Sequence, residues 1–290
     1  MKKSTKVISL TCLLLGIPAY LFADRAHDLA SQAASQRPAS CNPSTLDTKK
    51  CHDHFPTGCT DAKHPNYDAY LNFLKNQNPG PNEAATKLLS ESDFQSLERK
   101  IPAPLKTNGA RHARSAPALA NLGEGNIFAV IGFLYFVEDT GKGSSPNMET
   151  CNCKLPIAGS FDYHLGLGFD PALAKTIRDT HPQPDHNKPT QMEKTSVVAE
   201  MTPHTRHPKW TFDRVNALQG HQVKVVGQLM ADNVHLNTKD DCRFPHATPS
   251  CWRSTVWEIH PVTQFFACNL STPCSASSPD SAWTSLDNVP

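Results

Sequence analysis

Five acidic and histidine side chains lie in three short segments that are rich in strand-forming residues. The segments are "FDYHLGLGFD", "SVVAEMTP" and "TVWEIHPVTQF", and the five residues are Asp162, His164, Glu200, Glu258 and His260. Alternate residues of a strand point to the same face, so Asp162 shares a face with His164, and Glu258 shares a face with His260. Carboxylates and imidazoles that meet on one surface can bind a divalent metal ion or supply a general base.

Apolar neighbours indicate which face of each strand points into the protein. Tyr163, Ala199 and Trp257 stand in opposite phase to the polar residues of the three segments. If the three strands are neighbours, the polar side chains should form one patch on the outer face of a sheet, with Glu258 at its centre. All five residues are then candidate metal ligands, and the candidate catalytic residues are Glu258, His260 and Glu200.

The patch has three interpretations, which the sequence leaves open. Polar residues are ordinary on the outer face of an antiparallel sheet, where Glu–His and Asp–His neighbours form cross-strand pairs. Alternatively, the patch binds a ligand, with Asp162 and His164 among the contacts, or it holds a metal ion for hydrolysis. A divalent metal is therefore the one cofactor that the sequence suggests, and whether the chain is an enzyme stays open.

A second candidate set lies in "TPHTRHPKW", directly after the strand that carries Glu200. Arg206 can offer a charged contact and Trp210 a stacking face, and loops of OB barrels bind oligonucleotides or sugars. With His207, these two are the candidate ligand-binding residues of this loop. The alternative is a loop that enters a helix, with Pro208 near the first turn and Trp210 in the core.

Five strands and one helix are expected between residues 115 and 268. The strands are the segments 126–139, 161–170, 195–203, 221–232 and 254–268, and a helix over 207–220 separates the third from the fourth. The segment 171–194 is expected as a polar loop with room for one helical turn. Central glycines in the first and fourth strands, Gly132 and Gly227, suit bent or bulged strands. This order predicts an OB-like five-stranded Greek-key barrel, because a β-sandwich needs about seven strands.

Several strings of this region resemble a family of exported bacterial proteins of unknown function. They are "ETCNC", "DYHLGL", "SVVAEMTP", "HPKWTFDRVNALQGHQVKVVGQLMAD" and "RSTVWEIHPVTQF", within residues 115–266, and "WEIHPVT" is a fairly specific one. The resemblance implies export and an OB-like barrel that ends in the "WEIHPVT" strand, but no activity and no catalytic residue. In such a barrel the second, third and fifth strands are consecutive neighbours, so the five polar residues can meet.

The N-terminus has the pattern of a cleavable leader. The basic "MKKSTK" precedes the apolar "VISLTCLLLGIPAYLF", and "LFA" before Asp24 suits a cleavage site, so residues 1–23 are expected to be a signal peptide. The apolar run is too short for a convincing membrane anchor, so no transmembrane anchor should remain after cleavage. Of the ten cysteines only Cys12 lies in the leader, and so many cysteines fit an oxidising compartment. An exported protein, periplasmic or secreted, is therefore expected.

Residues 24–114 are expected to form an irregular, partly helical extension that disulfides staple and that packs on the barrel. Helical patterns occur in "NYDAYLNFLKNQ" and "SESDFQSLERKI", and the second starts with Ser90 and Asp93 at the spacing of a capping box. Cys51–Cys59 and Cys242–Cys251 would each close a short loop and are the expected disulfides. Residues 269–290 are expected to form a disordered tail.

Composition and motifs narrow the function only in part. The chain has 28 basic and 27 acidic residues, without the basic surplus that is typical of nucleic-acid-binding surfaces, so charge does not favour such a partner. It contains no P-loop, no G-x-S-x-G elbow and no H-E-x-x-H motif. We expect an exported OB-like binding protein with an oligonucleotide, glycan or envelope protein as its ligand. The alternatives are a metal-dependent phosphodiesterase or nuclease of the cell envelope and a purely structural envelope module.

Overall fold

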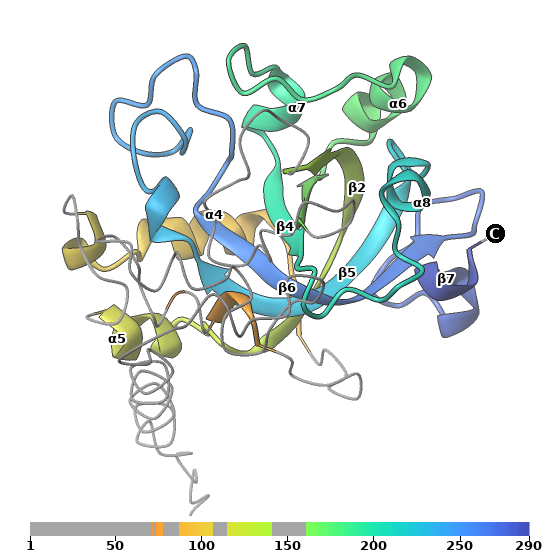
Figure 1. Cartoon of the computed structure of the whole chain (residues 1–290), viewed down its shortest axis with the longest axis horizontal. Helices are drawn as coiled ribbons and strands as arrows, with labels where there is room; N and C mark the ends of the chain where they lie inside the picture. The colour runs from red at the N-terminus through yellow and green to blue at the C-terminus, as the bar shows by residue number, and fades with distance from the viewer. Residues whose placement is uncertain (1–70, 72–73, 78–86, 107–114, 141–160, 290) are drawn as a thin grey trace, which may run out of the picture.

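The centre of the protein is a closed barrel of five strands (Figure 1). The computed structural model describes residues 71, 74–77, 87–106, 115–140 and 161–289. The barrel strands are β2 (Ile127–Asp139), β3 (Tyr163–Gly168), β4 (Val197–Met201), β5 (Gln222–Ala231) and β6 (Trp257–Cys268). Each lies within one of the five segments expected as strands, so this part of the prediction is confirmed.

The strand order is that of an OB-like barrel. It runs β2–β3–β4–β6–β5, and pairing of β5 with β2 closes it. Neighbouring strands are antiparallel except β4 and β6, which are parallel with Ala199 opposite Ile259. The long strand β2 pairs with β5 through its first half and with β3 through its second half. Consequently β3, β4 and β6 lie side by side, as the predicted fold requires.

Strand phase separates an apolar barrel interior from a polar outer face. Tyr163, Ala199 and Trp257 belong to one buried hydrophobic cluster, together with apolar residues of β2 and β5. The intervening positions, among them His164 and Glu200, point to the opposite face because successive side chains of a strand alternate. The orientation expected from the apolar neighbours is therefore confirmed.

Gly227 marks an irregular point of the barrel, as a glycine in the middle of a strand indicated. The register between β5 and β6 shifts on both sides of it. A β-carbon at this position would lie 2.4 Å from the carbonyl oxygen of Pro261. Only glycine allows the two backbones to approach so closely, and the bulge helps to bend β5 around the barrel.

The segment 171–194 contains more helix than expected. It forms α6 (Pro171–Thr180) and α7 (Gln191–Lys194) where a polar loop was predicted. Asp170 caps α6 by accepting hydrogen bonds from two backbone amides. Ala174 and Ile177 of α6 are buried against Tyr135 and Phe136 of β2, so a narrow apolar stripe is sufficient to hold this otherwise polar helix on the barrel.

The helix between the third and fourth barrel strands is present but shorter than expected. It is α8 (Phe212–Asn216), and Thr211 caps it by accepting a hydrogen bond from the amide of Arg214. Trp210 precedes the helix and is buried in the barrel cluster. The expected helix over 207–220 is therefore correct in place and wrong in length, because its first residues form the loop that brings Trp210 into the core.

The described part of the N-terminal region packs on the barrel. It includes β1 (Leu88–Leu89), which is parallel to β2, α4 (Glu91–Arg99), the 3-10 helix Ala103–Lys106 and α5 (Ala116–Asn121). The capping box of Ser90 and Asp93 starts α4 as predicted. Glu98 of α4 accepts hydrogen bonds from Thr255 Oγ1 at 2.6 Å and from the Val256 amide at 3.1 Å, which fastens this helix to the start of β6.

Other N-terminal predictions fall largely outside the described residues. These are the leader 1–23, the Cys51–Cys59 disulfide and most of the helix expected over 66–77. Within that helix Leu71, Leu74 and Lys75 are described and are helical. No helix in the described ranges is long and apolar enough to cross a bilayer.

The C-terminal segment is folded, so the expectation of a disordered tail over 269–290 is corrected. The 3-10 helices Asp280–Ala282 and Leu286–Asn288 flank β7 (Trp283–Ser285), which pairs with the end of β6. Leu286 and Trp283 are buried and anchor the segment. A disulfide that was not among the expected pairs, Cys268–Cys274, closes its first loop.

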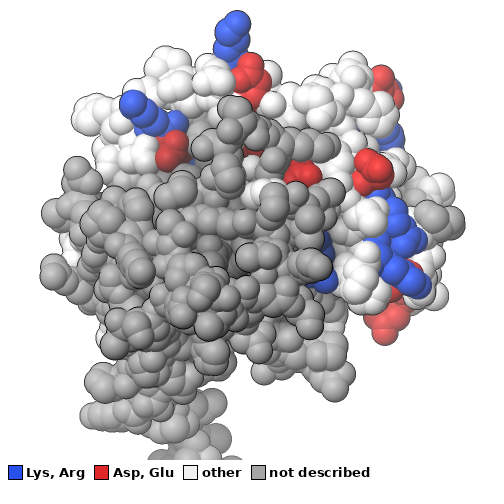
Figure 2. Space-filling view, viewed as in Figure 1, with Lys and Arg blue, Asp and Glu red and all other residues white. Residues whose placement is uncertain are grey.

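The expected disulfide Cys242–Cys251 is confirmed, in the connection between β5 and β6. Both disulfides are typical of proteins from oxidising compartments. On the described part of the face drawn in Figure 2, acidic side chains lie beside basic ones.

Removal of the Cys242–Cys251 bond is expected to lower the free energy of unfolding by about 2–3 kcal/mol, because it returns conformational entropy to the unfolded chain. The two cysteines are 9 residues apart in sequence. Urea denaturation of the wild type and of a Cys242→Ser/Cys251→Ser variant measures the loss. A Cys268→Ser/Cys274→Ser variant is the comparison, and it should lose slightly less because its loop spans only 6 residues. Unchanged stability of the first variant would contradict the expectation.

Candidate metal site

The five polar residues meet on the outer face of β3, β4 and β6. Asp162 directly precedes β3, His164 lies in β3 opposite Glu200 of β4, and Glu258 and His260 lie in β6. The pairing of Ala199 with Ile259 brings Glu200 beside both β6 residues. Two groups of three residues have potential ligand atoms within 4.8 Å of one another: Asp162, His164 and Glu200, and Glu200, Glu258 and His260.

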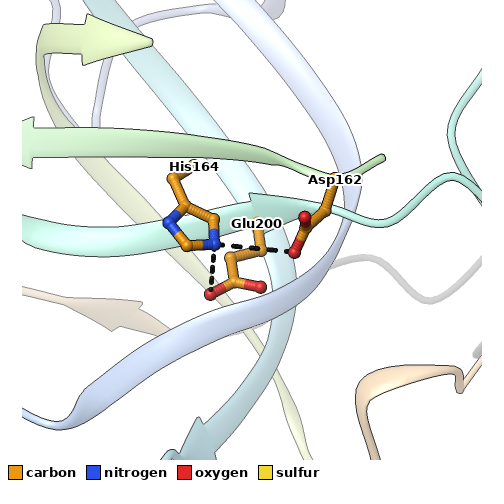
Figure 3. A group of neighbouring side chains, drawn as sticks. All are labelled: Asp162, His164 and Glu200. Atoms are coloured by element: carbon orange, nitrogen blue, oxygen red, sulfur yellow. Dashed lines mark ion pairs between the residues drawn. The ribbon is translucent and has the colours of Figure 1, made fainter. Parts of the chain in front are cut away.

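The first group, Asp162–His164–Glu200, surrounds one ring nitrogen of His164. Nε2 lies 3.5 Å from Asp162 Oδ2 and 3.3 Å from Glu200 Oε1. Figure 3 shows that both carboxylates face the same side of the imidazole and contact this same nitrogen. Thr140 donates a hydrogen bond to Oδ1 of Asp162, which fixes that carboxylate on its other side.

The second group, Glu200–Glu258–His260, surrounds Nδ1 of His260. This nitrogen lies 2.9 Å from Glu200 Oε2 and 3.1 Å from Glu258 Oε1. The other ring nitrogen, Nε2, lies 2.9 Å from Thr202 Oγ1, which holds the imidazole in place. Glu200 therefore belongs to both groups and is the centre of the cluster, which corrects the expectation that Glu258 is central.

The cluster is buried, although it lies on the outer face of the barrel. None of the five residues is more than 5% exposed. Part of the cover is the segment 74–77: Thr202 Oγ1 donates to the carbonyl of Lys75, and Gln228 Nε2 donates to the carbonyls of Leu74 and His260. Lys75 also forms a buried ion pair with Asp232 at 2.7 Å.

Burial and mutual charge control the protonation of the cluster. Burial is the main cause that raises the pKa of Glu200, and neighbouring Glu258 adds to it, whereas His260 opposes it. Burial alone would lower the pKa of His260, but the carboxylates of Glu200 and Glu258 raise it to about 9. In the metal-free protein at neutral pH, His260 is therefore an imidazolium between two acidic groups.

Three further residues complete the surroundings, and sequence reasoning missed them. Glu138 of β2 stands opposite His164 in the β2–β3 register, with its Oε2 3.9 Å from His164 Nδ1 and 2.7 Å from His186 Nε2. Arg253 Nη1 lies 3.1 Å from Glu258 Oε2, and both side chains are fully buried. Thr202, described above, is the third. Two of them had a usable signal: Glu138 lies in the first strand of an OB barrel, which pairs with the second, and Thr202 follows Glu200 by two residues in the same expected strand.

The candidate ligand-binding residues of the loop after β4 lie outside both groups and are used in contacts within the chain. The guanidinium of Arg206 lies 3.7 Å from the centre of the Tyr163 ring and donates to the carbonyls of Phe161 and Met201. Trp210 Nε1 donates to Asp287 Oδ1 at 2.7 Å, and His207 Nδ1 lies 3.4 Å from the same atom. These contacts favour a helix-entry loop with Trp210 in the core.

The cluster can bind a metal ion through imidazole nitrogens and carboxylate oxygens. Two neutral imidazoles and three carboxylates suit divalent first-row metal ions such as Zn²⁺ and Mn²⁺. The chain matches no known family model, and no curated protein and no solved structure is detectably similar to it. The resemblance to a family of exported proteins thus stays a prediction, and the function has to be inferred from the site.

Proposed function

We propose that this protein is an exported OB-like binding protein whose ligand is a divalent transition-metal ion, held between Asp162, His164 and Glu200. The observation that carries the proposal is the pair of contacts to His164 Nε2, at 3.5 Å and 3.3 Å. Both are longer than a good N–H···O hydrogen bond, which spans about 2.7–3.2 Å. They fit a tetrahedral ion whose donors lie about 2.0–2.2 Å away, because such donors are about 3.3–3.6 Å from one another.

The surroundings of His164 support the same assignment. A metal-bound histidine commonly uses its second ring nitrogen to contact a carboxylate, which orients the ring. Here the second nitrogen of His164 faces Glu138, and Glu138 is in turn held by His186. The ligands also come from paired strands of one barrel, so little rearrangement is needed to bring them around an ion.

The outer face of β3 and β4 is less suited to binding a larger ligand. OB domains bind oligonucleotides and sugars on the face of their second and third strands, here β3 and β4. Contacts with the segment 74–77 cover part of this barrel surface beside the cluster. Arg206 and Trp210 are used within the chain, and the charges on the visible surface are mixed (Figure 2). These observations favour a small ion over an oligonucleotide or glycan.

Burial favours a site that holds its ion over one that performs hydrolysis. Catalytic metal sites keep an open position for water or substrate, whereas structural sites are closed. The three protein donors leave one tetrahedral position, but the cluster residues are at most 5% exposed, which gives a substrate little access to it. Export is supported by the leader pattern at residues 1–23 and by two disulfides.

Elemental analysis of the exported protein, purified without chelator and then dialysed against Zn²⁺ or Mn²⁺, tests this proposal. At least one tightly bound ion per chain is expected. Asp162→Asn removes an anionic ligand and should weaken binding by roughly tenfold or more, since even partners outside the ligand shell contribute 10–100-fold. His207→Ala is the matched control, because this imidazole lies outside the cluster and should not affect binding. A protein that retains no ion from either solution would instead be a structural module in which the five residues are cross-strand partners.

A further inference from the structure

Glu200 turns its two carboxylate oxygens toward different imidazoles. Oε1 lies 3.3 Å from His164 Nε2, and Oε2 lies 2.9 Å from His260 Nδ1. We propose that the cluster is a two-metal centre in which Glu200 bridges two divalent ions. This inference rests on the proposed function, because the first ion is the one held by Asp162, His164 and Glu200. The second ion would lie between Glu200, Glu258 and His260.

The contacts of His260 are the main evidence for the second ion. A ring nitrogen bears at most one hydrogen, yet Nδ1 faces two carboxylate oxygens, at 2.9 Å and 3.1 Å. One hydrogen cannot point well at both oxygens, whereas a cation among the three atoms contacts all of them. The spacing also suits an octahedral ion, because donors about 2.1 Å from such an ion lie about 3.0 Å apart.

Two of the three ligands of the second ion, His260 and Glu258, have a partner that holds their remaining polar atom. Thr202 Oγ1 lies 2.9 Å from His260 Nε2, and Arg253 Nη1 lies 3.1 Å from Glu258 Oε2. Such outer contacts fix ligand orientation and are typical of metal sites. In both halves of the cluster an imidazole nitrogen faces two carboxylate oxygens, and in the half around His260 Thr202 also anchors the opposite ring nitrogen.

A shared carboxylate sets the distance between the two ions. Two-metal centres hold their ions about 3.5–4 Å apart, a separation that one bridging carboxylate spans. His164 and Glu200 are direct partners in the β3–β4 register, and β6 lies on the other side of β4. Glu200 is therefore the residue that the barrel places between the two imidazoles.

The number of ions per chain tests the inference on the full-length protein, refolded with Zn²⁺ and titrated in competition with a chromophoric chelator. Wild type should bind two ions, and Mn²⁺-loaded protein should give the electron paramagnetic resonance signal of a coupled pair. Glu258→Gln should bind one ion, Asp162→Asn the other, and Glu200→Gln should weaken both. His207→Ala should still bind two.

Glu258→Gln also removes the partner of Arg253, so a milder variant is needed. Thr202→Val removes the anchor of His260 and a hydrogen bond to the carbonyl of Lys75, but none of the proposed ligands. It should weaken the binding of one of the two ions while the circular dichroism spectrum stays unchanged. A single ion whose affinity is insensitive to Thr202→Val and Glu258→Gln would overturn the two-metal centre and leave the proposed function in place. A chain that binds no ion at all would overturn both.

Discussion

Replacement of Arg253 by methionine is expected to lower the free energy of unfolding of the metal-free protein by up to about 3 kcal/mol, because it removes one of the two cationic partners of the buried Glu258 carboxylate and leaves only His260. Arg253 Nη1 lies 3.1 Å from Glu258 Oε2, and neither side chain has any exposed surface. Methionine fills much of the same volume. The decrease in the free energy of unfolding should therefore come mainly from the missing positive charge and only to a small extent from a cavity. The guanidinium also lies 4.4 Å from the centre of the Trp252 ring, a contact that methionine can replace in part.

Urea denaturation monitored by circular dichroism measures this loss, and the chain offers a matched control. Arg243 pairs with Glu91 at 3.8 Å, and their side chains are 33% and 50% exposed. Arg243→Met should therefore change the stability by no more than about 1 kcal/mol. A second Glu258→Gln substitution should restore part of the stability of Arg253→Met, because it removes the buried charge that has lost its arginine partner. If Arg253→Met and Arg243→Met lower the free energy of unfolding equally, the buried pair stabilises the protein no more than the exposed pair does.

The barrel could be predicted because its strands are segments rich in strand-forming residues, and those that carry the polar cluster also show which face points inward. Tyr163, Ala199 and Trp257 each mark the inward phase of their strand, and all three belong to the barrel core. The order of strands and a single helix before the fourth strand then pointed to an OB-like topology. Once that topology holds, the convergence of Asp162, His164, Glu200, Glu258 and His260 follows from strand adjacency alone.

The central residue of the cluster could not be predicted from the sequence of any single strand. Glu258 has an imidazole two residues away in its own strand, which made it the apparent focus. In the barrel, however, β4 lies between β3 and β6, so Glu200 has a polar neighbour on each side. Glu258 lies next to β5 on its other side, where Met230 stands opposite it.

Burial of the cluster depends on contacts that are remote in sequence. Gln228 reaches the carbonyl of Leu74, and Lys75 reaches Asp232, across more than 150 residues of chain. Arg253 lies in an irregular connection without periodicity, so nothing in the sequence pointed to its pairing with Glu258. The folded C-terminal segment escaped prediction for a similar reason, since its anchors Trp283 and Leu286 form no periodic pattern.

The metal-free protein is expected to lose stability as the pH rises from about 6.5 to about 9, and His260 is the main cause. Glu200 and Glu258 raise the pKa of this buried imidazole from 6.5 in the unfolded chain to about 9. A group whose pKa is higher in the folded state stabilises the fold fully below its unfolded pKa. That contribution is lost as the pH rises through the folded pKa. A shift of this size corresponds to roughly 3 kcal/mol.

Urea midpoints measured with chelator at pH 6.5, 8 and 9.5 test this, because the chelator keeps any metal ion from competing with the proton. Wild type should become less stable across the series. His260→Gln keeps a polar side chain but cannot carry the proton, so it should be less stable than wild type at pH 6.5 and approach it at pH 9.5. His207→Gln should keep the wild-type slope, since the half-exposed His207 lies outside the cluster. If His260→Gln instead falls in parallel with wild type, His260 is neutral throughout and the charge between Glu200 and Glu258 has another source.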